Sequence, residues 1–162
     1  LHEGAPVNLR RLTSDHEPNV VSFVIDEPQG WVTAANAAKG LLIGYSWDTA
    51  EYPWLNIWRH SPNGKPVARG IEFGTTGLHQ PFPVLMRKRS IFDRPLISFL
   101  DAGESHTRGY SMFLAEIGAS YSGTGSVRVA NDGNRISISI VERGGSANRL
   151  VLELRSTLGQ SQ

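Results

Sequence analysis

The sequence contains no cysteine and only two methionines. Disulfides, thiolate nucleophiles and zinc–thiolate sites are therefore excluded. No apolar stretch approaches the roughly 18 residues that a membrane-spanning helix requires, so we expect no membrane partner. An excess of either charge is also missing, because 16 Lys and Arg stand against 15 Asp and Glu, for a net charge of +1. This balance removes the main electrostatic argument for nucleic acid as a partner.

The composition is that of an ordinary globular domain. The 162 residues are 40% hydrophobic and 19% charged, and a folded chain of this length buries enough surface to form a core. We therefore expect one domain over residues 1–162, with a frayed tail at 159–162. The chain begins with Leu1 and has no recognisable leader, which is typical of a piece of a longer protein and leaves the localisation unknown.

Short segments of alternating apolar and polar residues predict an all-β fold. In the clearest segment, Ile136, Ile138 and Ile140 share one face, and an antiparallel meander is expected over 126–156. The spacing of strands and turns predicts an antiparallel β-sandwich with little or no helix. Further strands are expected at 20–25, 30–33, 41–47, 55–58, 71–74, 96–100 and 111–117.

Three segments carry more specific predictions. Residues 34–39 give the only helical signal and are too short to form a stable helix alone. Residues 112–117 are apolar on both faces apart from Glu116, which is typical of a central strand in stacked sheets. The glycine-rich segment 123–125 lacks a phosphate-binding pattern and is expected to be a turn.

The residues that could contact a sugar are concentrated between positions 45 and 83. Aromatic rings stack on the C–H faces of a sugar, while guanidinium groups hold its hydroxyls. The alternative for each tryptophan is a place in the core, since tryptophan is usually well buried. The candidate substrate-binding residues are Trp47, Trp54, Trp58, Arg59 and Arg69.

Glu72 is the leading candidate for acid–base chemistry. It lies in an apolar strand between Gly70 and Gly74, which allow close approach of backbone or ligand. A carboxylate in such a strand is rarely buried without a partner. Glu72 is therefore either a general base or one half of an ion pair with Arg59 or Arg69.

Two histidines near Glu72 are candidates for the acid, His60 and His79. His79 lies in a proline-rich loop, where a solvated surface position is the alternative. No histidines have the HxH, HxxxH or HExxH spacing of a metal site, so neither a metal nor another cofactor is predicted.

A family resemblance supports this interpretation. The stretch Tyr52-Pro53-Trp54-Leu55-Asn56-Ile57-Trp58, followed by Ala68-Arg69-Gly70-Ile71-Glu72-Phe73-Gly74, resembles the aldose 1-epimerase, or galactose mutarotase-like, superfamily. Its poorly characterised bacterial branch is the closest in pattern. The similarity continues through Arg89-Ser90-Ile91-Phe92-Asp93-Arg94-Pro95, covers about residues 31–117, and corresponds to about the C-terminal half of such proteins.

The resemblance implies a β-supersandwich that binds sugars in a cleft. In this superfamily a glutamate takes the proton of the anomeric hydroxyl and a histidine donates one to the ring oxygen, so the ring opens and recloses as the other anomer. Glu72 matches the glutamate. The histidine and a substrate-holding arginine usually come from the preceding half, so His79 and His60 are local alternatives. Half a supersandwich leaves a sheet edge or face uncovered, which a homodimer would cover.

The sequence thus predicts a carbohydrate-active protein that takes a mono- or oligosaccharide and, if it is an enzyme, is an aldose 1-epimerase-like isomerase. A non-catalytic carbohydrate-binding module is the first alternative. A glycoside hydrolase or lyase is the second; it needs a second carboxylate or a tyrosine near Glu72, and the sequence offers only Asp48, Glu51 and Asp101. An interaction domain without a ligand site remains, since fold analogy does not establish function.

Overall fold

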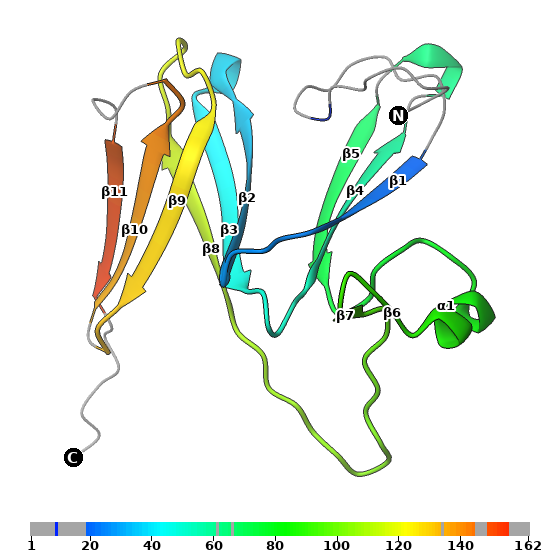
Figure 1. The fold of residues 1–162 in the computed structure, drawn as a ribbon. Coiled ribbons are helices and arrows are strands. Elements are labelled where there is room, and N and C mark those ends of the chain that lie inside the picture. Colours follow the sequence, from blue (N-terminus) through cyan, green and yellow to red (C-terminus); the bar gives the residue numbers. More distant parts are fainter. Residues whose placement is uncertain are drawn as a thin grey trace. The chain divides into compact units, whose positions relative to one another are not determined.

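The computed structural model describes residue 9 and residues 19–60, 62–65, 67–133, 135–144 and 149–155 (Figure 1). These residues form antiparallel strands with one α-helix and two short 3₁₀ turns, which confirms the prediction of an all-β fold with little helix. Within this part of the chain, no helix has the length and apolarity needed to cross a membrane. The expected tail at 159–162 lies outside the described residues.

The chain divides into two compact units, which we describe separately. Unit 1 comprises Leu1–Pro28 and Thr49–Arg108, and unit 2 comprises Gln29–Asp48 and Gly109–Gln162. A single domain over 1–162 stays a prediction.

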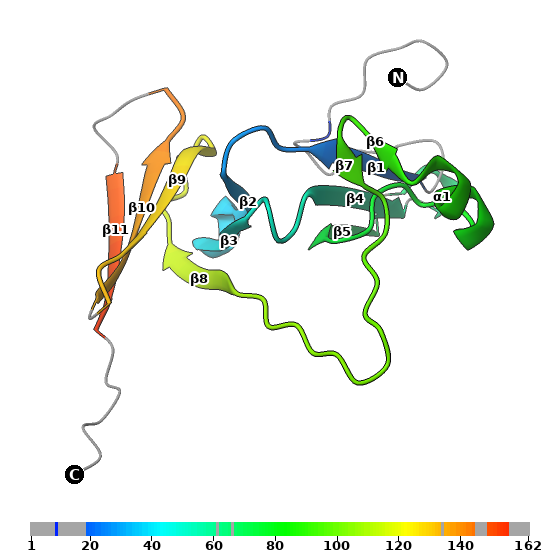
Figure 2. The same ribbon diagram turned by 60° about the horizontal axis from the view of Figure 1, so that its bottom comes forward.

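Unit 2 consists of two three-stranded antiparallel sheets that share one core (Figure 2). Leu42 and Phe113 of one sheet pack with Ile138 and Ile140 of the other. The expected alternation of the isoleucines is confirmed, because Ile138 and Ile140 are both buried. The first sheet has the order β2-β3-β8, with β2 at Gln29–Asn36, β3 at Leu41–Asp48 and β8 at Tyr110–Glu116. The second has the order β11-β10-β9, with β9 at Thr124–Asn131, β10 at Arg135–Glu142 and β11 at Arg149–Arg155.

Three local predictions in unit 2 need correction. Strand β2 continues to Asn36, so only Ala37–Lys39 is helical, as a 3₁₀ turn. Strand β8 is an edge strand in the described chain, and the side chains of Met112 and Leu114 are 58% and 61% exposed. Thr124 and Gly125 belong to strand β9, where Thr124 pairs with Glu142 on β10, and the Thr124 hydroxyl also accepts a hydrogen bond from the Thr33 hydroxyl at 2.8 Å.

Unit 1 is built on the sheet β1-β4-β5. Trp54 of this sheet is buried, as are Leu85 and Leu96 from the segment that follows, and these three residues form the core of the unit. The Trp54 Nε1–H donates a hydrogen bond to the Pro95 carbonyl at 2.6 Å. The sheet strands are β1 at Asn19–Val24, β4 at Trp54–His60 and β5 at Ala68–Gly74, with a 3₁₀ turn at Pro62–Gly64. Helix α1 spans Phe82–Lys88, and the short strands β6 and β7 span Ser90–Ile91 and Arg94–Pro95.

The segment after β5 differs from its prediction. The expected strand at 96–100 does not form, because β7 ends at Pro95 and Leu96 enters the core from an irregular segment. Helix α1 was not expected from the proline-rich sequence, yet Pro83 lies in its first turn, where a missing N–H costs nothing. The helix brings Leu85 into contact with the Trp54 cluster.

The register of unit 1 fixes which residues share a face of its sheet. Asn56 lies opposite Ser22 on β1 and opposite Glu72 on β5, while Trp58 lies opposite Gly70. Successive residues of a strand point to opposite faces, so these five residues share one face.

Candidate functional site

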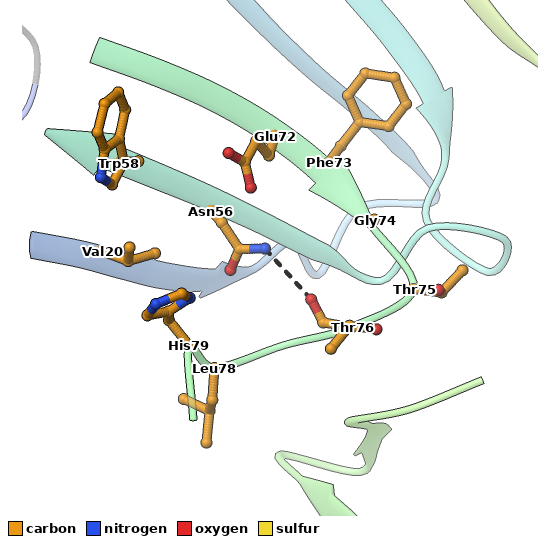
Figure 3. Close-up of a pocket in the computed structure, with 10 residues that line it drawn as sticks. All are labelled: Val20, Asn56, Trp58, Glu72, Phe73, Gly74, Thr75, Thr76, Leu78 and His79. Atoms are coloured by element: carbon orange, nitrogen blue, oxygen red, sulfur yellow. Dashed lines mark hydrogen bonds between the residues drawn. The ribbon is translucent and has the colours of Figure 1, made fainter. Parts of the chain in front are cut away.

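A groove of about 720 Å³ lies on this face of the unit 1 sheet (Figure 3). All of its lining residues belong to unit 1. They come from three strands and from the segment after β5: Val20, Asn56, Trp58, Glu72, Phe73, Gly74, Thr75, Thr76, Leu78 and His79. Its volume falls in the range of about 300–1,000 Å³ that is typical of ligand sites.

Gly70 leaves room between Trp58 and Glu72. A Cβ atom at Gly70 would lie 3.3 Å from the Cε3 atom of Trp58 and 3.6 Å from the Oε1 atom of Glu72. The side chains of Trp58 and Glu72 therefore both lie against the backbone of Gly70. Glycine at this position lets both side chains lie close to the strand, where a Cβ atom would crowd the indole.

Trp58 presents an aromatic surface in the groove. Its side chain is 37% exposed, and its ring stacks on His60 with a centroid distance of 5.6 Å and an interplanar angle of 7°. His60 does not line the groove and covers one face of the indole instead. The structure therefore places His60 as a support for Trp58.

His79 reaches the groove from the segment that follows β5. The Asn56 carboxamide donates to the Thr76 carbonyl at 3.3 Å, as the dashed line in Figure 3 shows. The Leu78 N–H donates to the Ser22 hydroxyl at 3.2 Å, and this hydroxyl donates to Oδ1 of Asn56 at 2.7 Å. Hydrogen bonds to two strands thus hold the segment that carries His79.

The predicted arginines lie on the other face of the sheet. Arg59 and Arg69 are register partners; Arg59 is one position from Trp58, and Arg69 is three positions from Glu72, so each points to the face opposite these side chains. Arg59 is only 3% exposed, and Arg69 Nη1 donates to the Leu9 carbonyl at 2.6 Å. The sheet therefore separates both guanidinium groups from Glu72, and the structure does not bring them into the groove.

The other predicted residues also lie away from the groove. Trp54 is 2% exposed and belongs to the core of unit 1, while Trp47 is buried in unit 2. The three carboxylates considered for a hydrolase do not line the groove either; they are Asp48, Glu51 and Asp101. Of the residues predicted from the sequence, the groove collects Glu72, His79 and Trp58.

Sequence reasoning assigned no role to Asn56 or Ser22. Asn56 stands two positions before Trp58, so the strand period already placed the two side chains on one face. Ser22 had no such signal, because its partners are 34 and 56 positions away in the sequence.

The described lining of the groove carries little charge. Among the described lining residues, Glu72 is the only aspartate, glutamate, lysine or arginine, and both Glu72 and His79 are exposed. Within the described part of the chain, no three histidine, aspartate or glutamate side chains cluster as metal ligands would. The arrangement offers one carboxylate, one imidazole, one carboxamide and one indole to a ligand.

Comparison with known proteins yields no match among family models, curated proteins or solved structures. The similarity to the aldose 1-epimerase superfamily therefore stays an expectation, and a functional proposal depends on the residues of the groove.

Proposed function

We propose that the groove in unit 1 binds a neutral sugar and that Glu72 and His79 interconvert the anomers of this sugar. The observation that carries the proposal is the convergence of Trp58, Glu72, Asn56 and His79 on one groove. An indole with polar groups beside it suits a sugar ring, which has apolar C–H faces and a rim of hydroxyls. The carboxylate and the carboxamide supply acceptors and donors for those hydroxyls.

The charge of the groove favours a neutral sugar over an anionic one. Glu72 is the only aspartate, glutamate, lysine or arginine among the lining residues that the structure describes, and the nearby Arg59 and Arg69 belong to the opposite face. A uronate or a sugar phosphate would place a second negative charge near Glu72, and the described lining holds no lysine or arginine to compensate for it. We therefore expect neutral aldoses to bind more tightly than their acidic derivatives.

The proposed reaction needs one proton acceptor and one proton donor. The Glu72 carboxylate accepts the proton of the anomeric hydroxyl as the bond between C1 and the ring oxygen breaks. Protonated His79 donates its proton to that oxygen, which gives the open-chain aldehyde. After rotation about the C1–C2 bond, the two transfers reverse and the ring closes as the other anomer. Glu72 and His79 return to their starting protonation states.

One observation favours a second candidate, a carbohydrate-binding module without catalysis. Glu72 and His79 are both exposed, whereas catalytic acids and bases commonly lie in sites from which water is excluded. A glycoside hydrolase is not supported, because the described groove lining holds one carboxylate and this reaction usually uses two.

Two measurements test the proposal. Calorimetry with D-glucose, D-galactose, D-glucuronate and D-glucose 6-phosphate measures binding and charge preference. Exchange NMR spectroscopy on α- and β-glucose and α- and β-galactose measures the rate of anomer interconversion. Binding with acceleration supports the proposal, and binding without acceleration supports the module. Absence of binding to either neutral aldose, or a preference for the acidic sugars, would contradict it.

Replacing Trp58 with alanine is expected to weaken the binding of a neutral aldose by about tenfold, since an aromatic stacking contact is worth about 0.5–1.5 kcal/mol beyond its buried area. Calorimetry on the variant measures the change. Trp58→Phe keeps a ring at this position and should lose less affinity. Tyr110→Ala removes an exposed aromatic side chain of unit 2 and serves as the control. An unchanged affinity in Trp58→Ala would exclude stacking on this residue.

A further inference from the structure

The Ser22 hydroxyl on strand β1 forms hydrogen bonds with two residues that line the groove, Asn56 on β4 and Leu78 in the segment after β5. Ser22 does not line the groove itself. It donates to Oδ1 of Asn56 at 2.7 Å and accepts from the Leu78 N–H at 3.2 Å. The carboxamide of Asn56 in turn donates to the Thr76 carbonyl at 3.3 Å. These three hydrogen bonds hold the backbone of Thr76 and Leu78, which precede His79 in the chain.

The backbone at Leu78 needs such support. Its φ angle is +62°, in the left-handed region that costs a residue with a side chain about 1–2 kcal/mol. A residue keeps this conformation only when its surroundings hold it there. The Gln80 N–H donates to the Leu78 carbonyl at 3.0 Å, which continues the turn beyond His79. The direction of the chain at His79 therefore depends on how Leu78 is held.

We infer that Ser22 is a positioning residue for the groove. By holding Leu78 and orienting the Asn56 carboxamide, it fixes the imidazole of His79 and the amide of Asn56 relative to Glu72. The inference rests on the proposed function, since it assigns Ser22 a role in the same site. Its structural part, the holding of the segment 76–79, is testable in the free protein.

The first experiment measures amide hydrogen exchange in the free protein. Ser22→Ala removes the acceptor of the Leu78 N–H, and a hydrogen bond of ordinary worth corresponds to about a tenfold faster exchange of the Leu78 amide. Ser22→Thr keeps the hydroxyl and should restore slow exchange. Ser90→Ala, in strand β6 of the same unit, is the matched control. Equal exchange rates in Ser22→Ala and the wild type would overturn the inference, whether or not a sugar binds.

The second experiment asks whether Ser22 acts through His79. The dissociation constant for D-glucose is measured in the wild type, Ser22→Ala, His79→Ala and the double variant. We expect Ser22→Ala to weaken binding several-fold in the wild type and less in the His79→Ala background, because coupled residues are not additive. Equal loss in both backgrounds would overturn the role in positioning His79. If the wild type does not bind D-glucose while the exchange result holds, the proposed ligand is wrong and the structural role of Ser22 stands.

Discussion

Replacing Glu72 with glutamine is expected to slow anomer interconversion by about 10²–10⁴-fold, the usual contribution of a positioned general base. Glutamine has nearly the same shape and still offers an oxygen to a hydroxyl, so the affinity for the sugar should change much less than the rate. Exchange NMR spectroscopy on α- and β-glucose gives the rate, and calorimetry gives the affinity.

The control for this variant is Glu104→Gln, which removes an exposed carboxylate of unit 1 that does not line the groove. It should leave both rate and affinity unchanged. If Glu72→Gln interconverts anomers at the wild-type rate, Glu72 is not the base. If it loses binding instead, the carboxylate is a ligand contact, which agrees with a binding module.

Replacing Trp54 with alanine is expected to lower the free energy of unfolding of unit 1 by about 3–5 kcal/mol. Trp54 is buried against Leu85 and Leu96, and the variant also loses the hydrogen bond to the Pro95 carbonyl. Gly77 lies so close to the indole that a Cβ atom there would fall on the ring. Urea unfolding, followed by near-ultraviolet circular dichroism, measures the loss.

Trp58→Ala is the matched control for this experiment, because it removes the same side chain from the same strand at a position that is far more exposed. Its loss of stability should be clearly smaller. Equal losses in the two variants would contradict the placement of Trp54 in the core and of Trp58 in the groove.

The strands of the protein were largely predictable because alternation depends on neighbours in the sequence. The pattern of Ile136, Ile138 and Ile140 needs only one buried face, and the structure confirms it for Ile138 and Ile140. The segment after β5 was not predictable, because Leu96 is buried through contact with Trp54, far away in the sequence. Tertiary contacts of this kind outweigh local preference.

The candidate site was predictable in part for a similar reason. The placement of Arg59 followed from strand geometry, since a residue next to Trp58 must point to the other face. The difference between Trp54 and Trp58 did not follow, because both share one face and Trp54 is buried by Leu85, Leu96 and Gly77, which come from the chain after β5. The link from Ser22 to Leu78 also required the folded chain, as nothing in the sequence relates them.

Unit 2 is formed by two segments of the chain, and Thr49–Arg108 of unit 1 lies between them in the sequence. This order affects how the protein folds during translation. Strand β3 pairs with β2 at once, but its other neighbour is β8, and Leu41 meets Glu116 only after the whole of Thr49–Arg108 has been synthesised. The edge of β3 therefore stays unpaired while that segment is synthesised, and the apolar side of the β2–β3 hairpin stays uncovered until β9 and β10 have followed. Long-range pairing of this kind slows folding and exposes the incomplete sheet to misfolding and aggregation. Chaperone capture during translation should accordingly be strongest between the emergence of β3 and that of β10.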